Sequence, residues 1–390
     1  MNVVAQHITA AAHRAGTRTL HAGGPIAFVL NHAMQPQKAR LVAAAAAGLA
    51  AALAAHVYQR WRMRRRIRRM TKVELHAHLN GSIRPTTLRR LAAERGLDAA
   101  CLDEKRTLEV CFEVFALIHK CVDRLEVVAL VALEFLEDLR ADGCAYVELR
   151  TTPRALQGRT EADYVKTVCN VLSGAPGITA RLLVSIDRSR GPEAAKRTLA
   201  GVANLRRSDA AVDRVVVGVD FSGNPTSKHG FDAFERLFRE VRDEWGLGCA
   251  LHVGETPRSD GDAAKILKFA AEKPRRVRFG HALAFSDHEL RGCASLIEAC
   301  PSSNSATLDL AQLADHPRLW ARFSEVAGPP LAICTDDAGV FDCSLSGEYL
   351  KVHDAFGPVD LVRVVDDAAA AAFDARAIEA VRRRRTQYNV

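Results

Sequence analysis

An alternation of short apolar runs with helical segments, repeated from residue 72 onward, most constrains the fold of this chain. Eight runs that are rich in apolar and β-branched residues end in polar residues, at 72–78, 145–151, 180–187, 215–221, 250–253, 277–281, 296–299 and 331–335. Segments between them, such as 112–118 and 231–241, place apolar residues at the helical period of 3.6. This pattern predicts a (β/α)8 barrel. A doubly wound sheet is the alternative, although no G-x-G-x-x-G motif follows an early strand.

Every predicted strand ends in ionisable or hydrogen-bonding side chains. In (β/α)8 barrels the catalytic groups lie at the carboxyl ends of the strands, on one rim. The residues in these positions include His76, His78, Glu148, Arg150, Asp187, Asp220, His252, His281, Asn304, Asp336 and Asp337. We therefore expect this rim to form an active site.

A metal site is predicted from four of these residues. His76 and His78 lie two residues apart on a strand, so their side chains project from the same face. His252 and Asp336 end two later strands, and three imidazoles with one carboxylate leave room for a water molecule, as in catalytic zinc sites. The alternative for Asp336 and Asp337 is a helix N-cap, but adjacent carboxylates at a strand end repel each other unless a cation is present. We predict one Zn²⁺ held by His76, His78, His252 and Asp336.

Three further residues are candidates for proton transfer at this metal. A metal ion lowers the pKa of bound water toward neutrality, and the water then needs a partner that holds its proton. Asp337 and His281 are placed for that role, and Glu255 is placed to protonate the electrophile. An apolar wall around Glu255 would raise its pKa and allow it to donate. The sequence thus predicts a metal-dependent hydrolase.

The charge distribution argues against a nucleic-acid partner. The net charge is +8, but residues 1–73 contain no Asp or Glu and hold twelve of the 54 Lys and Arg residues. The other 42 basic residues face all 46 acidic residues, so the remainder of the chain is slightly acidic. Ten cysteines without a C-x-x-C pair indicate reduced thiols, and hence a cytoplasmic protein.

Residues 1–70 are predicted to be a non-globular leader, followed by one catalytic domain over 71–390. An apolar, Ala-rich run at 41–55 precedes the arginine-rich segment 60–69. A membrane anchor is one interpretation, although this run spans only about 22 Å as a helix and a bilayer core is ~30 Å thick. An organelle transit peptide and an upstream extension without a fold are the other two. Contact with a membrane is expected only if the leader is retained.

Several segments together resemble the adenosine/AMP deaminase family, over essentially all of 72–390. They are VELHAHLNGS at 73–82, VELRTTPR at 147–154, GVDFSGN at 218–224, LHVGE at 251–255, FGH at 279–281 and CTDDAGVF at 334–341. Within this family the chain looks most like the adenosine deaminase-like proteins that act on N6-methyl-AMP. The indicators are Asn80, the segment FALIHK at 115–120 and the loop RTTPR at 150–154.

The resemblance implies hydrolytic deamination at purine C6, in a barrel of the metal-dependent hydrolase type with one zinc ion. In this scheme Glu255 protonates N1, while Asp337 and His281 orient the attacking water. The Gly223 N–H meets N3, and Asp187 contacts the ribose or the phosphate loop. A neutral amide at Asn80 suits a 5′-phosphate, where adenosine deaminases carry an aspartate. The residues expected to bind substrate are His78, Asn80, His119, Thr151, Thr152, Pro153, Arg154, Asp187, Gly223 and Asp337.

We therefore predict a monomeric enzyme that converts N6-methyl-AMP to IMP and methylamine. The alternative within enzymes is adenosine deaminase, which acts on the nucleoside. A membrane-tethered scaffold without catalytic activity would use the arginines at 60–69 to bind anionic lipid. Such a scaffold requires a degenerate site, yet every expected ligand and catalytic group is present in the sequence.

Overall fold

The computed structural model describes residues 36–255, 262–291, 293–319 and 329–388. Residue contacts divide the chain into two units, Met1–Trp61 and Arg62–Val390. The described part of the first unit belongs to helix α2, Pro36–Arg69, whose many alanines favour helix. No helix in the described ranges has the length and apolar character needed to cross a membrane. The leader over 1–70 stays a prediction, and residues 1–35 of it lie outside the described residues.

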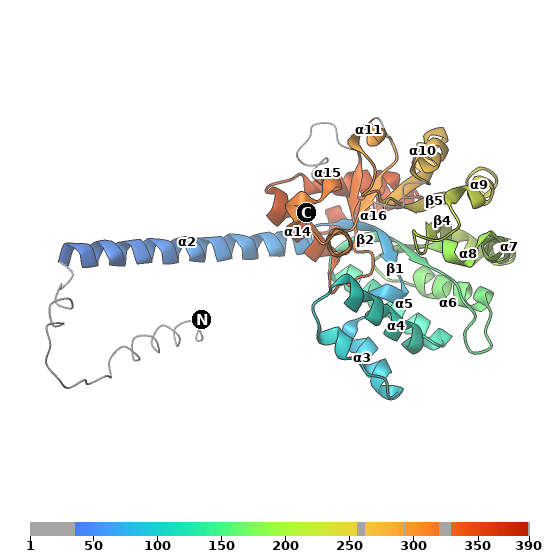
Figure 1. Cartoon of the computed structure of the whole chain (residues 1–390), viewed down its shortest axis with the longest axis horizontal. Coiled ribbons are helices and arrows are strands. Elements are labelled where there is room, and N and C mark those ends of the chain that lie inside the picture. The colour runs from blue at the N-terminus through green and yellow to red at the C-terminus, as the bar shows by residue number, and fades with distance from the viewer. Residues whose placement is uncertain (1–35, 256–261, 292, 320–328, 389–390) are drawn as a thin grey trace. The chain divides into compact units, whose positions relative to one another are not determined.

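The second unit contains eight parallel strands that pair in chain order (Figure 1). They are β1 Lys72–His78, β2 Cys144–Thr151, β3 Thr179–Asp187, β4 Val216–Ser222, β5 Gly248–Val253, β6 Val277–His281, β7 Ile297–Ala299 and β8 Leu331–Ile333. Just beyond β8, Asp336 forms a parallel bridge with Ala77 of β1, which returns the sheet to its first strand. The predicted (β/α)8 barrel is confirmed, and each strand lies within two residues of its predicted bounds.

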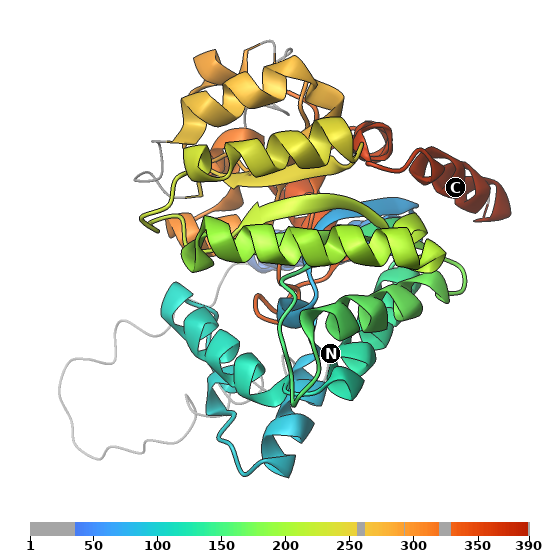
Figure 2. The same ribbon diagram turned by 90° about the vertical axis from the view of Figure 1, so that its right-hand side faces the viewer.

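Helices surround the strands of this unit, as Figures 1 and 2 show. They are α3 Pro85–Glu94, α4 Leu108–Cys121, α5 Leu125–Ala141, α6 Glu161–Ser173, α7 Pro192–Ser208, α8 Ala210–Val215, α9 Glu235–Arg239, α10 Ala263–Glu272, α11 Asp287–Leu290, α12 Pro301–Leu308, α14 Leu345–Phe356, α15 Leu361–Ala371 and α16 Arg376–Tyr388. In α5, Val128, Val131, Phe135 and Leu139 recur every three or four residues and are buried, so one apolar stripe joins the core. The segment 231–241 is instead divided among a 3-10 turn, α9 and a π-helical turn at Glu240–Glu244.

The interior of the barrel is unusually polar. Branched apolar side chains generally fill a (β/α)8 barrel, whereas here Glu148, Arg150, Arg278 and Glu298 are all buried inside it. Their charges are paired with one another, which is the condition for burying them at tolerable cost. The interior of the barrel thus contains a network of buried ion pairs.

Phe373, in the connection between α15 and α16, packs into the amino-terminal part of the barrel. Its ring centroid lies 3.8 Å from the guanidinium carbon of Arg278, and its N–H donates to Glu148 Oε1 at 2.7 Å. A Cβ atom added to Gly248 would lie 2.1 Å from the Phe373 ring. Gly248 is therefore required by this close approach.

Gly248→Ala should lower the free energy of unfolding by about 1–3 kcal/mol, because the new methyl group displaces the Phe373 ring. The matched control is Gly201→Ala in the middle of α7, where nothing lies within 4 Å of the added Cβ. That variant should be about 0.5–1 kcal/mol more stable, since alanine is the better helix former. Urea unfolding measures both values, and equal stability of the two variants would contradict this packing.

Candidate active site

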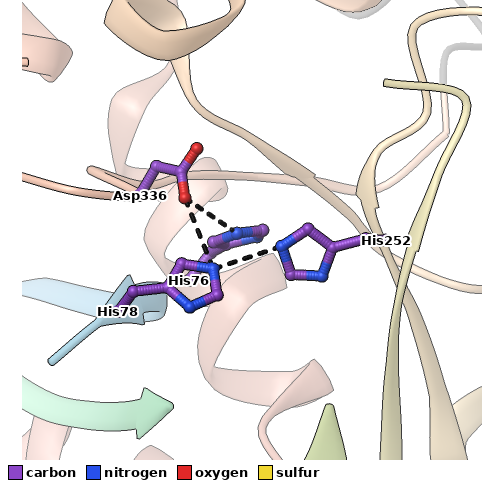
Figure 3. Close-up of side chains that lie close together, drawn as sticks. All are labelled: His76, His78, His252 and Asp336. Carbon is purple, nitrogen blue, oxygen red and sulfur yellow. Dashed lines mark hydrogen bonds and ion pairs between the residues drawn. The ribbon is translucent and has the colours of Figure 1, made fainter. Parts of the chain in front are cut away.

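Four side chains from opposite sides of the barrel meet at its carboxyl end. His76 and His78 come from the same face of β1, His252 from the end of β5, and Asp336 from the segment after β8. Figure 3 shows the three imidazole rings and the carboxylate directed toward one another. One potential ligand atom from each residue lies within 4.8 Å of the others. The structure thus brings together the four residues that the sequence predicts as a metal site.

The distances within this group fit a tetrahedral metal ion. His78 Nε2 lies 3.2 Å from His252 Nε2, and Asp336 Oδ1 lies 3.3 Å from His76 Nε2 and 3.5 Å from His78 Nε2. A tetrahedral zinc site with ligand distances near 2.0–2.1 Å has edges of roughly 3.3 Å. Nε2 of His76 is buried and makes no hydrogen bond. The donor set and its spacing therefore fit a bound divalent cation.

Two buried carboxylates hold the far sides of these rings. His76 Nδ1 lies 2.9 Å from Glu298 Oε2 of β7, and His252 Nδ1 lies 3.0 Å from Asp220 Oδ1 of β4. A carboxylate accepts a hydrogen bond from Nδ1–H, so the ring proton stays on Nδ1 and the lone pair is on Nε2. Both Nε2 atoms thus face the centre of the group as acceptors, as metal ligation requires.

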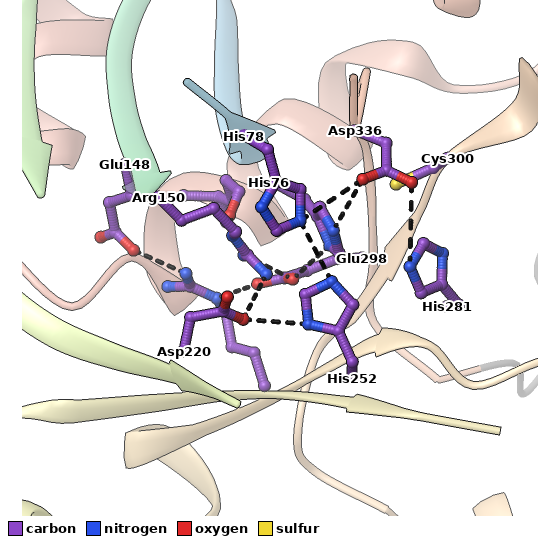
Figure 4. Close-up of polar contacts among 12 residues, drawn as sticks. His76, His78, Glu148, Arg150, Asp220, His252, His281, Glu298, Cys300 and Asp336 are labelled. Carbon is purple, nitrogen blue, oxygen red and sulfur yellow. Dashed lines mark hydrogen bonds and ion pairs between the residues drawn. The ribbon is translucent and has the colours of Figure 1, made fainter. Parts of the chain in front are cut away.

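Arg150 of β2 connects the two carboxylates. Its guanidinium donates to Asp220 Oδ1 at 3.0 Å and to Glu298 Oε2 at 2.8 Å, and it also donates to the Leu75 carbonyl at 2.6 Å. Figure 4 shows this network beside the histidines. Arg278 continues it by donating to Glu298 Oε1 and Glu148 Oε2, both at 2.6 Å. The orientation of the ligand rings is therefore fixed by a continuous set of buried ion pairs.

The three predicted proton-transfer residues lie next to the metal group. A ligand atom of Glu255, two residues past β5, lies within 4.8 Å of those of His252 and His281. Its Oε1 is buried without a hydrogen bond, and burial raises the pKa of the carboxyl group. Burial and the neighbouring Asp336 raise the pKa of Asp337 well above its usual value. His281 Nε2 lies 3.9 Å from Asp336 Oδ2.

Backbone strain is concentrated at these residues. His281 and Asp336 adopt left-handed conformations, with φ of 64° and 62°, which costs about 1–3 kcal/mol at each. Barrel hydrogen bonds hold the second one in place, since the Asp336 N–H donates to the His76 carbonyl and the Asp336 carbonyl accepts from the His78 N–H, both at 2.8 Å. A Cβ atom on Gly81 would lie 1.7 Å from Asp337 Oδ1, so only glycine admits Asp337 there.

The residues predicted to contact the phosphate come from three neighbouring elements. Thr151 Oγ1, at the end of β2, lies 2.8 Å from the hydroxyl of Tyr164 in α6, and that hydroxyl lies 3.5 Å from Asn80 Oδ1. Arg154 donates to the carbonyl of Val122, just after α4. Burial, followed by the charge of Arg154, lowers the pKa of His119 in the last turn of α4.

The other residues predicted to contact the substrate lie in or after β2, β3 and β4, and most of them contact other parts of the protein. Asp187, the last residue of β3, accepts from the Ser189 N–H at 2.9 Å and so caps a 3-10 turn. Gly223 has φ of +92°, and a Cβ atom there would lie 2.0 Å from Asp187 Oδ1. The carbonyl of Pro153 accepts from Arg190 at 3.4 Å. Thr152 lies next to Thr151 at the carboxyl end of β2.

Comparison with known proteins places this chain in a family. The family model described as adenosine deaminase matches residues 71–383. The chain belongs to the adenosine deaminase family. It is 34% identical over 314 residues to N6-methyl-AMP deaminase of Danio rerio, a match that covers 74% of this chain and 86% of the relative. The corresponding human protein is 31% identical over 311 residues, covering 74% of this chain and 83% of the relative.

Solved structures of relatives show the same architecture. A crystal structure of Arabidopsis N6-mAMP deaminase is 31% identical, with a TM-score of 0.70, and the match covers 83% of this chain and 98% of that one. An Arabidopsis relative in complex with IMP is 30% identical, with a TM-score of 0.70 and coverage of 83% and 97%. The family is metal-dependent, and this chain is a purine deaminase, a hydrolase.

Several residues that contact the site residues were not assigned roles from the sequence, although the sequence contains a hint of some of them. Glu298 is the acidic residue of a short apolar strand, Leu296 to Ala299, and a buried acid in such a place needs a partner. Asp220 stood among the polar strand ends but had no assigned role. Tyr164 lies in a helix whose apolar periodicity alone explains its burial. No local pattern pairs Tyr164 with Asn80.

Glu298→Gln should weaken metal binding about 10–100-fold, because His76 loses a charged acceptor at Nδ1. The matched control is Glu348→Gln in α14, an equally buried glutamate whose partners are Ser302 and Lys351. Titration of the metal-free protein with Zn²⁺ against a competing chelator measures the affinity. An unchanged affinity in E298Q, or an equal loss in E348Q, would argue against the orienting role of Glu298.

Proposed function

We propose that this enzyme is a zinc-dependent deaminase that converts N6-methyl-AMP and water into IMP and methylamine. The observation that carries the proposal is that Asn80 and Arg154 follow the carboxyl ends of β1 and β2, with His119 close enough to Arg154 for its pKa to be affected. These groups suit the phosphate of a nucleotide better than the hydroxyl of a nucleoside. Relatives named N6-methyl-AMP deaminase, and an Arabidopsis relative in complex with IMP, support this choice.

Zinc is the metal that best fits the donor set. Zinc is commonly bound by imidazole nitrogens and carboxylate oxygens, and its coordination can expand to five, which would admit a water molecule beside these four residues. A bound zinc ion supplies Lewis-acid activation of water near neutral pH. His76, His78, His252 and Asp336 would hold it.

The surrounding residues account for the proton transfers. Glu255, whose pKa is raised by burial, donates a proton to purine N1 while the water oxygen bonds to C6. Asp337 accepts a proton from the attacking water and passes it to the departing amine. The C6–N6 bond then breaks and methylamine leaves. Of the two water protons, one replaces the proton that Glu255 gave to N1, and the other leaves on the amine.

The side-chain amide of Asn80, which we propose contacts the phosphate, is oriented by Tyr164. The Tyr164 hydroxyl lies 3.5 Å from Asn80 Oδ1, which directs the Nδ2 donors of Asn80 away from Tyr164. Arg154 supplies a positive charge for the phosphate, and that charge together with burial lowers the pKa of the neighbouring His119. The Gly223 N–H is proposed to meet purine N3, where its lack of a side chain permits close approach.

Glu255→Gln should lower kcat by about 10²–10⁴-fold, because glutamine has no proton to give to N1. Zinc binding should remain unchanged, since Glu255 is outside the four-residue metal group. Turnover of N6-methyl-AMP followed by ultraviolet absorbance, together with zinc content of the purified variant, tests this. Retention of full activity would remove Glu255 from the mechanism.

A substrate panel of N6-methyl-AMP, AMP, adenosine and N6-methyladenosine tests the substrate class. We expect kcat/KM to be highest for N6-methyl-AMP, and a preference for adenosine would favour the alternative of an adenosine deaminase. Asn80→Asp should reduce the preference for the 5′-monophosphate over the nucleoside by at least about tenfold, because a carboxylate repels phosphate. Asn170→Asp on the exposed face of α6 adds the same charge away from the site and should leave the ratio unchanged.

A further inference from the structure

A chain of hydrogen bonds leads from the reaction centre into the protein through His281, Asn304 and His316. Asn304 lies in the first turns of α12, and His316 follows the 3-10 turn Leu313–Asp315. All three residues are buried, with exposed fractions of 4%, 1% and 0%. His281 Nδ1 lies 2.8 Å from Asn304 Nδ2, and Asn304 Oδ1 lies 3.0 Å from His316 Nε2. The metal group and the proton-transfer residues described above do not include Asn304 or His316.

Backbone groups at the inner end fix the proton of His316. The N–H groups of Arg318 and Leu319 lie 3.2 and 3.4 Å from His316 Nδ1. A backbone N–H can only donate, so Nδ1 of His316 accepts and carries no proton. Burial lowers the pKa of His316 to about 4, so the ring is neutral and its single proton lies on Nε2. His316 therefore donates to Asn304.

A second backbone group fixes the orientation of the Asn304 amide. The N–H of Cys300 lies 3.2 Å from the same Asn304 atom that faces His316. Two donors converge on this atom, so it is the carbonyl oxygen and the other amide atom is the NH₂ group. That NH₂ group donates to Nδ1 of His281. The proton of a neutral His281 ring is consequently on Nε2, the atom that faces Asp336 Oδ2 at 3.9 Å.

We propose that His316, acting through Asn304, is a positioning residue that keeps the ring proton of His281 on Nε2. His281 then presents an N–H donor to the reaction centre and is not the base that removes the proton of water. This inference rests on the proposed deamination for its catalytic consequence. There the donor stabilises the oxygen as it bonds to C6, while Asp337 receives the proton.

Asn304→Asp is the sharpest test, because a carboxylate of the same shape accepts where the amide donates. It should move the ring proton of His281 to Nδ1. Two-bond ¹H–¹⁵N correlation spectra of the zinc-loaded protein labelled at histidine distinguish the two tautomers. The chain has 14 histidines, so the signals of His281 are identified by their loss in His281→Gln. The kcat for N6-methyl-AMP should fall about 10–100-fold with little change in KM.

Two variants of His316 separate positioning from packing. His316→Leu removes the donor to Asn304, so we expect mixed His281 tautomers and a loss of kcat of about 10–100-fold. His316→Gln retains an N–H that can donate to Asn304 and should keep the wild-type tautomer and most of the turnover. Urea unfolding midpoints of Asn304→Asp, His316→Leu and His316→Gln show whether a loss of kcat reflects a loss of folded protein.

The spectra decide the proposal independently of activity. A wild-type His281 protonated on Nδ1, or a proton that stays on Nε2 in both Asn304→Asp and His316→Leu, overturns it. If the wild-type protein turns over no purine while the spectra show the expected tautomers, the proposed function fails and the positioning role stands. An equal loss of kcat in His316→Gln and His316→Leu, with unchanged tautomers, would show that the residue acts only in packing.

Discussion

The ion pairs of Arg150 with Asp220 and Glu298 are the interaction on which the site depends. Arg150 is fully buried, and each carboxylate that it binds also holds the Nδ1 side of a metal-facing histidine. Removing one member of a buried ion pair leaves an unpaired charge in the protein interior and costs about 3–5 kcal/mol. Loss of any of these contacts is therefore costly, and the contacts together direct Nε2 of His76 and His252 toward the same point.

The net charge of the ion pairs and Asp336 is compatible with a divalent cation at the metal group. Arg150 and Arg278 contribute two positive charges, whereas Glu148, Glu298, Asp220 and Asp336 contribute four negative charges. The sum of −2 is matched by a divalent cation at the meeting point of the imidazoles. Asp336 also joins β8 to β1 through its backbone. The cation would thus bind at the seam of the barrel, where ligation and barrel closure stabilise each other.

Much of the fold and the centre of the site follow from the sequence, because both depend on local periodicity. Alternation along β1 places His76 and His78 on one face, and strand ends in a parallel barrel share one rim, so His252 and Asp336 join them. The contacts of Tyr164 with Asn80 and of His316 with Asn304 join segments whose separation in the chain has no periodic signature. Side-chain hydrogen bonds between distant elements depend on packing details that a single sequence does not encode locally. These side-chain contacts were therefore harder to predict from the sequence than the metal group.

The partner on the far side of each imidazole decides what that histidine does at the site. The carboxylates beside His76 and His252 accept a hydrogen bond from Nδ1–H, which keeps the ring proton on Nδ1 and leaves the lone pair of Nε2 for a metal. The amide of Asn304 instead donates a hydrogen bond to Nδ1 of His281, so the ring proton lies on Nε2, which becomes the donor. The rings of His76 and His281 lie only 4.8 Å apart and share the same chemistry, and yet they present opposite polarity to the reaction centre. The carboxylate of Glu298 at Nδ1 of His76 and the amide of Asn304 at Nδ1 of His281 are sufficient to give one ring an acceptor and the other a donor at Nε2.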